Sequence, residues 1–260
     1  MSSTFVIADS RDRDEHKYRN NCDRLPDYND LTHALEEAVA ADNSGLNNEM
    51  WGTIVDRDGV VCAVARTGDD RDDQWPGSRV ISAQKANTAN AFSLPARSGG
   101  LVPGLSLSTA NLYTAVQPSG SLFGLQHSNP VDTSVAYGGD SRRYGHRDDP
   151  MVGKKIGGVN VFGGGLALYD EDGRKLGAVG VSGDTSCRDH IVAWIVRDEL
   201  ELDFVPAGVS PTGDDNMIQD FVPAPKTDFP FSPSGFGHPF CGFGEEAVIP
   251  GLPMDYPTGS

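Results

Sequence analysis

Residues 182–190, Ser-Gly-Asp-Thr-Ser-Cys-Arg-Asp-His, contain side chains suited to acid–base or nucleophilic chemistry. Cys187 and His190 are three positions apart, so on a helix they lie on nearly the same face, one turn from each other. A helix N-terminus lowers a thiol pKa and favours anions, so Cys187 could act as a thiolate or lie beside a substrate carboxylate. Asp189 and His190 are the matching acid–base candidates, and His190 is also a candidate haem or metal ligand. In the structural alternative, Cys187 is a small buried residue and His190 is a capped or surface imidazole.

Four further residues could bind a ligand near this segment. Lys85 lies in an alanine-rich run, where a buried lysine needs an anionic partner such as a ligand carboxylate or propionate. The alternative is a lysine that faces solvent. The hydroxyl of Ser182 and the backbone N–H groups after it favour an anion at a helix start. Gly164 and Gly165 lack the order of a phosphate-binding loop and indicate a bulge or a close backbone approach.

The remaining histidines and acidic clusters carry weaker signals. His33 and His127 are alternative ligands, although a single histidine on a mixed helix face is more often structural. No role is assigned to His146 or His238, and no metal site is predicted. Aspartate clusters at 69–73 and 148–149 lack the spacing of a calcium loop and are interpreted as solvated loops.

Two hairpins and three helices are predicted to position these residues. Residues 30–41 form a helix with an N-cap at Asn29 or Asp30. Two β-branched runs within 51–66 flank an Asp-Gly turn and predict a hairpin, and a helix follows from about Ser78 to Phe92. A second hairpin is predicted over 159–182, and a helix over 187–200.

The remaining segments are long and irregular. Residues 1–28 are interpreted as a polar arm, and residues 29–205 as the domain, with an insertion at 93–157. Such a long segment rich in Gly, Ser and Pro is uncommon unless it is functional or builds an interface. Residues 206–260 hold ten of the 17 prolines and six phenylalanines. They predict an extended tail that wraps its own or a neighbouring subunit. This element order is typical of an α+β layer domain.

Composition restricts the class of partner. Hydrophobic residues make up 38% of the 260 residues and the net charge is −16, which argues for a packed core and against nucleic acid or an anionic membrane as partner. No apolar run is long enough to span a bilayer. The start lacks a basic region followed by an apolar one, so a cytoplasmic location is expected for the chain as given. A processed secreted form is the alternative.

Four cysteines, Cys22, Cys62, Cys187 and Cys241, occur in the chain. None of them forms a Cys-x-x-Cys pair, which argues against structural zinc. Four cysteines in a chain of this length do not form a disulfide scaffold either, so reduced thiols are expected.

Three segments in this order resemble the GlcG/HbpS family. They are Val55-Asp-Arg-Asp-Gly59, Lys85-Ala-Asn-Thr-Ala89, and Gly163-Gly-Gly-Leu-Ala-Leu-Tyr169 leading to Gly177-Ala-Val-Gly-Val-Ser-Gly183. The resemblance implies a profilin-like antiparallel sheet of about five strands with packed helices, usually assembled as a homo-oligomer. It also implies haem as a ligand, with Thr88 as an oxygen ligand or pocket wall. The middle insertion and the aromatic tail depart from the short family pattern and could remodel the pocket.

Two functions from different classes follow. The leading hypothesis is a GlcG/HbpS-type protein that binds haem or a related small anionic ligand, with a redox or haem-handling role. The alternative is a catabolic enzyme for an aromatic or hydroxy-acid metabolite. In that enzyme Lys85 anchors the substrate anion, and Cys187, Asp189 or His190 supplies the reacting group.

Overall fold

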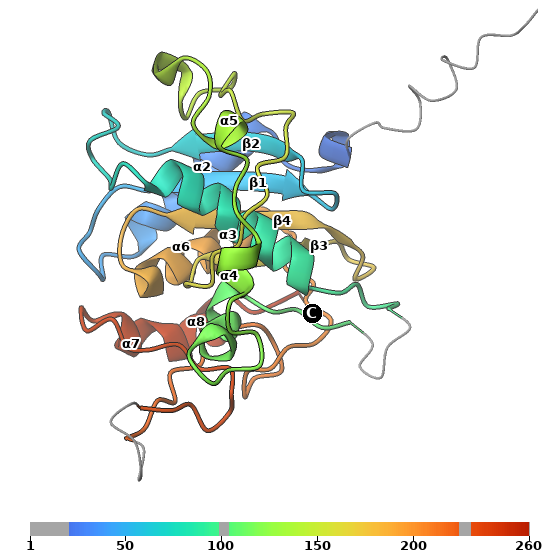
Figure 1. Cartoon of the computed structure of the whole chain (residues 1–260), viewed down its shortest axis with the longest axis vertical. Coiled ribbons are helices and arrows are strands. Elements are labelled where there is room, and N and C mark those ends of the chain that lie inside the picture. The colour runs from blue at the N-terminus through green and yellow to red at the C-terminus, as the bar shows by residue number, and fades with distance from the viewer. Residues whose placement is uncertain (1–20, 99–103, 224–229, 260) are drawn as a thin grey trace, which may run out of the picture.

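An antiparallel sheet forms the centre of the molecule. The computed structural model describes residues 21–98, 104–223 and 230–259. Strands β1 (Trp51–Asp56), β2 (Val61–Arg66), β3 (Gly165–Tyr169) and β4 (Lys175–Ser182) lie in the order β2-β1-β4-β3 (Figure 1). Both predicted hairpins are confirmed, and β1 joins them by pairing antiparallel with β4. The α+β class is confirmed, with four strands where about five were expected.

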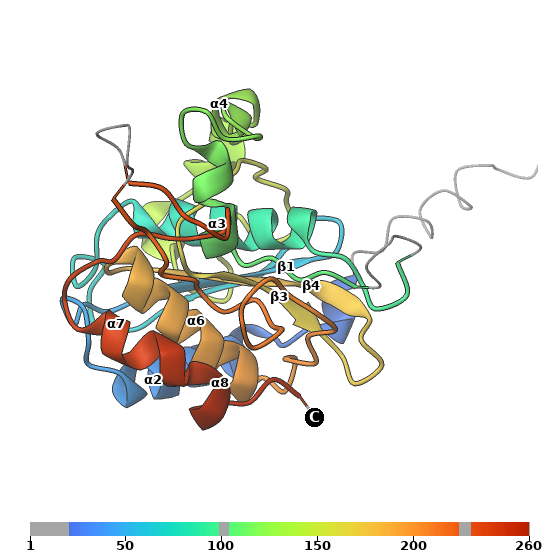
Figure 2. The same cartoon turned by 90° about the horizontal axis from the view of Figure 1, so that it is seen from below.

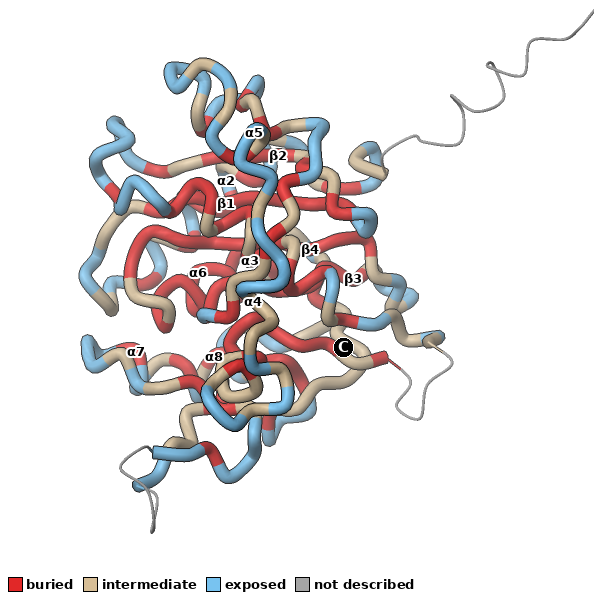
Figure 3. Tube along the Cα trace, in the orientation of Figure 1, coloured by how far each residue is buried: buried red, intermediate tan, exposed pale blue. Residues whose placement is uncertain are grey.

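Helices cover both faces of the sheet. Figure 2 shows α3 (Ser78–Phe92) on one face and α2 (Tyr28–Ala41) with α6 (Ser186–Glu199) on the other. The strands alternate accordingly, because successive side chains point to opposite faces. Ile54 and Val179 pack with α2 and α6, whereas Val55 and Ala178 pack with α3. Most residues of the four strands and of the inner faces of the helices are buried (Figure 3).

The helix starts follow local hydrogen bonding. The N-cap of α2 is Asp27 rather than Asn29 or Asp30, because the Asp27 carboxylate accepts the N–H groups of both. Thr185, within the predicted group of capping residues, caps α6 and accepts the N–H of Arg188.

The insertion is not a structureless loop. It forms short helical turns, namely η3 (Thr109–Leu112), η4 (Thr114–Val116), α4 (Leu125–Ser128), α5 (Thr133–Ala136) and η5 (Ser141–Arg143). Arg79 of α3 donates its Nε to Asp149 at 2.8 Å, and both side chains are buried. Ser106 donates to Asp215 at 2.6 Å, which ties the start of the insertion to the C-terminal segment.

The C-terminal segment packs on its own domain. Its short helices, α7 (Glu245–Val248), η6 (Ile249–Gly251) and α8 (Leu252–Asp255), lie beside α6 (Figure 2). Met217, Ile249 and Leu252 join the core on this side of the sheet. The expected extended tail is therefore, within the described residues, an additional layer that covers α6.

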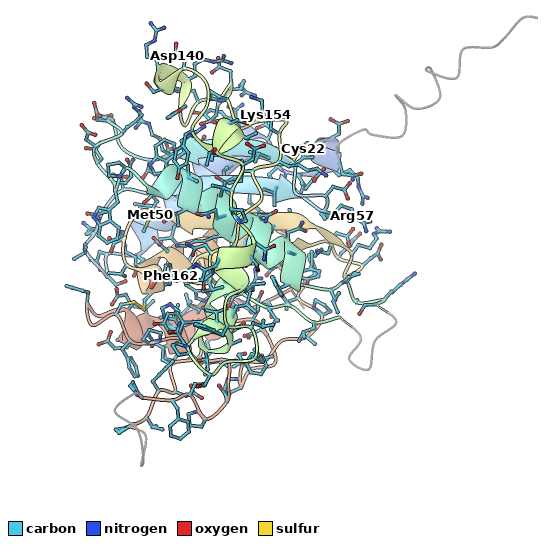
Figure 4. The ribbon with its side chains drawn as sticks, in the orientation of Figure 1. Cys22, Met50, Arg57, Asp140, Lys154 and Phe162 are labelled. Atoms are coloured by element: carbon cyan, nitrogen blue, oxygen red, sulfur yellow. A yellow bond between two sulfur atoms is a disulfide. The ribbon has the colours of Figure 1, made fainter. Side chains whose placement is uncertain are left out.

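At the other terminus, most of the predicted arm lies outside the described residues. The part that is described, η2 (Asn21–Arg24), is joined to β2 by a disulfide between Cys22 and Cys62 (Figure 4). No helix in the described parts of the chain combines the length and apolarity that crossing a bilayer requires.

Candidate functional site

Lys85 is buried and paired with Asp189. Its Nζ lies 2.6 Å from Asp189 Oδ2 and donates to the Val181 carbonyl at 3.1 Å, and 1% of the lysine is exposed. The lysine extends from α3 on one face of the sheet to α6 on the other. The required anion is therefore a carboxylate of the same chain, which leaves no charge at Lys85 for a ligand.

Asp189 has partners for both of its oxygens. Its Oδ1 accepts the N–H groups of Gly183 and Asp184, each at 3.0 Å, and Ser182 Oγ lies 3.5 Å from Oδ2. Burial raises the pKa of Asp189 to about 6 and lowers the pKa of Lys85, and each partner opposes the shift of the other. The predicted anion-binding groups after Ser182 thus bind Asp189 itself.

The backbone at Gly164 and Gly165 lies directly against the Lys85–Asp189 ion pair. A Cβ on Gly164 would lie 2.9 Å from Asp189 Cβ and 3.1 Å from Lys85 Nζ, and one on Gly165 would lie 2.6 Å from the Lys85 carbonyl oxygen. The two glycines let the start of β3 pass directly over the ion pair. They permit a close backbone approach and do not line an open pocket.

His190 is buried on the far side of the same helix turn. Its Nε2 accepts the N–H of Met217 at 3.0 Å, and Nδ1 is buried without a hydrogen-bond partner among the described residues. Burial lowers the pKa of His190 to about 4, against the attraction of Asp215. His190 is therefore a neutral imidazole at neutral pH and is shielded from solvent.

The prediction of reduced thiols is wrong. Cys22 is bonded to Cys62, and Cys187 to Cys241, so no described cysteine is free. Cys187 is accordingly not a thiolate in this form, although it lies in the first turn of α6 as predicted. The pairs are 40 and 54 residues apart, a distance at which spacing alone gives no signal.

A histidine that sequence reasoning left without a role lies beside the second disulfide. His238 is 1% exposed, and its Nδ1 lies 4.0 Å from Cys187 Sγ and 2.8 Å from the Pro239 carbonyl oxygen. Its Nε2 lies 3.3 Å from Ser186 Oγ. Burial lowers the pKa of His238 to about 4. The Pro-rich sequence around His238 gave no signal of a role, because His238 reaches α6 only through the folded path of the C-terminal segment.

Three other predicted residues lie apart from this cluster. Thr88 donates to the Gln84 carbonyl at 2.7 Å and accepts the N–H of Asn160 at 3.0 Å, so its hydroxyl is occupied by two hydrogen bonds to the backbone. His33 is exposed on α2, on the opposite face of the sheet from Thr88. His127 is exposed in the insertion. The structure therefore brings together Lys85, Ser182, Asp189 and the two glycines, with Cys187 and His190 nearby.

An aromatic cavity of about 650 Å³ opens between the insertion and the tail. Tyr113 is its central residue, with ring centroids 6.1 Å from Phe221 and 5.1 Å from His238. The remaining lining comes from Gln117, Pro118, Ser119, Pro230 and Phe231. No Lys or Arg among the described residues lines it, so the described part of its wall suits a largely apolar ligand.

A second cavity, of about 500 Å³, is basic. It lies where both hairpin turns meet the end of α3, and Arg57 marks it in Figure 4. Lys175 donates to the Ser93 carbonyl there, and its pKa is lowered to about 8 by burial and by the charge of Arg57. Five of the chain's 21 basic residues line the cavity: Arg24, Arg57, Arg97, Arg174 and Lys175.

The fold and these sites define a single-sheet α+β protein with internal cross-links and with ligand-sized cavities that include the aromatic and the basic one. The chain belongs to the HbpS-like family, because the family's model, described as "Haem degrading protein HbpS-like", matches residues 25–196. The resemblance seen in the sequence is thereby confirmed.

Individual relatives are distant. An uncharacterised 15.0 kDa protein from the dhaT-dhaS intergenic region of Citrobacter freundii is 29% identical over 164 residues, which cover 63% of this chain and 84% of that protein. The structure of ORFY from Klebsiella pneumoniae is 24% identical, covers 66% of this chain and 86% of that one, and has a TM-score of 0.43. A structure titled as a PduOC–haem complex is 23% identical, covers 68% and 96% of the two chains, and has a TM-score of 0.45.

Proposed function

We propose that the protein binds haem in the aromatic cavity between the insertion and the tail. The observation that carries the proposal is the cavity itself, about 650 Å³ in volume and walled by Tyr113, Phe221 and Phe231 with two prolines. Ligand cavities in proteins are typically a few hundred to about 1,000 Å³ and mostly apolar. Membership in a family described as haem-degrading supports the same ligand class.

The residues present fit a porphyrin with an oxygen ligand. Tyr113 is half-buried and supplies a phenolic oxygen beside the aromatic wall, and tyrosine is an established axial ligand of haem iron. The buried histidines His190 and His238 do not line the cavity. Because no basic side chain of the described residues lines it, the propionates would face the solvent.

Titration with haemin, followed through the Soret band, tests the proposal. Wild-type protein should bind one equivalent, and Phe221→Ala should weaken binding by up to about tenfold, since an aromatic contact contributes about 0.5–1.5 kcal/mol beyond the area it buries. Tyr113→Phe should shift the ferric spectrum while retaining part of the affinity. The control is Phe123→Ala, which changes an insertion residue that is 64% exposed. A wild-type titration without a saturable Soret change would refute haem binding.

A small anionic ligand in the basic cavity is the second candidate. Arg57 and Arg97 line that cavity and form no ion pair with a described residue. Arg24 and Arg174 are paired with Asp170, so Arg57, Arg97 and Lys175 carry the uncompensated charge. In a chain of net charge −16, such a cluster favours a di- or tricarboxylate.

Citrate is the probe for this second site. Calorimetry should detect binding that Arg57→Ala weakens and that salt reduces, because exposed charges are screened. Arg142→Ala, at an exposed arginine in the insertion, should leave binding unchanged. Equal citrate binding by both variants would exclude the cavity as the site.

A homo-oligomer is proposed as the assembled form. Phe240 and Phe243 of the tail are each 54% exposed, and exposed apolar groups of this kind mark association surfaces. A second copy of the chain is the proposed occupant. Light scattering after size exclusion should show a smaller species for Phe240→Ser/Phe243→Ser than for wild type. An unchanged mass would remove these residues from the interface.

A further inference from the structure

Cys187, Cys241 and His238 form a compact cluster that the haem proposal does not use. One ligand atom from each lies within 4.8 Å of the other two. Cys187 comes from the first turn of α6, whereas His238 and Cys241 come from the tail. The described residues contain no other such group of His, Cys, Asp or Glu.

We propose that reduction of the Cys187–Cys241 disulfide converts this cluster into a binding site for Zn²⁺, with both sulfur atoms and His238 Nδ1 as ligands. A dithiol reductant transfers two electrons and two protons to the disulfide and becomes a disulfide itself. Zn²⁺ then displaces the two thiol protons, which pass to solvent. The cross-link and the metal are mutually exclusive occupants of the site.

The donor set matches the chemistry of zinc. Two thiolates and an imidazole are borderline-soft ligands that Zn²⁺ prefers in tetrahedral sites, and three protein ligands leave the fourth position for water. The first turn of α6 favours thiolate at Cys187, because the N-terminal N–H groups carry partial positive charge.

The surroundings of the cluster already orient its ligands. Ser186 Oγ lies 3.3 Å from His238 Nε2, and His238 Nδ1 lies 4.0 Å from Cys187 Sγ. Metal-bound histidines commonly have their other ring nitrogen held in this way. Nδ1 also lies 2.8 Å from the Pro239 carbonyl oxygen, a contact that the metal ion would replace. Gln219 Nε2 donates to Cys187 Sγ at 3.7 Å, and such a donor stabilises a metal-bound thiolate.

In both states the cluster joins the tail to α6. The disulfide links two segments that are 54 residues apart, and a metal bound by the same atoms would hold them equally close. Cys241 is half-buried, which gives a reductant access that fully buried Cys187 does not offer. The tail also supplies Phe221 and Phe231 to the aromatic cavity, so the redox state can affect that cavity.

The test uses the full chain, reduced with dithiothreitol, desalted without oxygen and dialysed against Zn²⁺. The variant Cys22→Ser/Cys62→Ser removes the other two thiols and should still bind one equivalent when reduced. Oxidised protein should bind none. His238→Ala should weaken binding by roughly tenfold or more, since even outer-shell changes at metal sites cost about that much. With Co²⁺ in place of Zn²⁺, the reduced protein should show a thiolate charge-transfer band.

Two results would overturn the proposal. One is equal Zn²⁺ affinity in the reduced protein with and without His238. The other is an absence of binding by reduced Cys22→Ser/Cys62→Ser whose circular dichroism matches that of the oxidised protein. If reduction unfolds the chain, Zn²⁺ must restore the native spectrum, and failure to do so counts against the site. Haemin binding by the oxidised protein is unaffected by either result, so this proposal and the proposed function can fail separately.

Discussion

Lys85 Nζ and Asp189 Oδ2 lie 2.6 Å apart and connect the helices on the two faces of the sheet. The lysine passes the end of the sheet where β3 begins and β4 ends, and donates to the carbonyl of Val181 on the way. The sheet therefore holds a charged link between α3 and α6 as well as two apolar interfaces. Because both groups are buried, the loss of either one leaves an uncompensated charge.

Removal of Lys85 alone should be strongly destabilising. We expect Lys85→Met to lower the free energy of unfolding by about 3–5 kcal/mol, because Asp189 is left buried without its cation. The double variant Lys85→Met/Asp189→Leu should recover much of this loss. Urea denaturation of wild type, Lys85→Met and the double variant gives the three free energies of unfolding. Arg142→Met, at an exposed ion pair, should leave the free energy of unfolding nearly unchanged and is the control.

If the double variant is no more stable than Lys85→Met, the pair is not energetically coupled. In that case the destabilisation would come from lost packing of the lysine side chain on α3.

Gly180 should tolerate no side chain. A Cβ at this position would lie 2.0 Å from the backbone oxygen of Ser82, so α3 would have to move away from β4. We expect Gly180→Ala to lower the free energy of unfolding by about 2 kcal/mol or more. Gly77→Ala, where the nearest atom would be 3.5 Å away, should cost about 1 kcal/mol or less, because alanine is a poorer N-cap of α3 than glycine. Similar stabilities for both variants would show that α3 shifts without cost.

His190 should make stability fall as the pH drops below neutral. Its pKa is lowered from 6.5 to about 4 by burial, so between these values the unfolded chain binds a proton that the folded chain does not. Stability is therefore fully present above pH 6.5 and is lost as the pH falls toward 4. Among the charged groups around His190, Asp215 raises its pKa, whereas Arg197 and Lys85 lower it. The contribution of His190 between pH 7 and pH 5 is about 2 kcal/mol.

Asp189 partly offsets this trend. Its pKa is raised to about 6, so the folded chain takes up a proton before the unfolded chain does, and this contribution grows as the pH falls from 6 to 3.8. His238, whose pKa burial also lowers to about 4, adds a loss of the same sign as His190. His190→Gln should therefore shrink, without abolishing, the fall in unfolding free energy between pH 7 and pH 5, as measured by urea denaturation. His33→Gln is the exposed-histidine control. If the difference in unfolding free energy between pH 7 and pH 5 is the same in His190→Gln as in wild type, His190 is not a buried, neutral imidazole in the folded chain.

Much of the fold could be predicted because its signals are local. The turn at Asp58-Gly59 and the alternation in both hairpins depend on neighbouring residues, as do the alanine face of α3 and the cap of α6. The sheet order was accessible only through the family resemblance, since β1 and β4 are far apart in the chain.

The site was harder to predict, because its determinants are long-range. The importance of Lys85 and Asp189 could be inferred from residue type, but not their contact across 104 positions. Cys241 and His238 reach α6 only through the path of the tail, which no periodic pattern specifies. The same holds for Tyr113, whose partners Phe221 and His238 lie more than 100 residues later.

The Cys22–Cys62 disulfide should stabilise the fold and shape the basic cavity together. It closes a loop with a sequence separation of 40, for which the chain-entropy estimate is about 4 kcal/mol. Cys22→Ser/Cys62→Ser should lower the melting temperature in calorimetry, and the loss of unfolding free energy should be of the same order as this entropic term. It should also weaken citrate binding, because η2 carries Asn21 and Arg24 into the cavity and is held to β2 by this bond. Asn21 would keep its hydrogen bond to Asp56, so the loss should be partial. Lower stability with unchanged citrate affinity would separate the two roles and leave Arg57 and Arg97 as the binding groups.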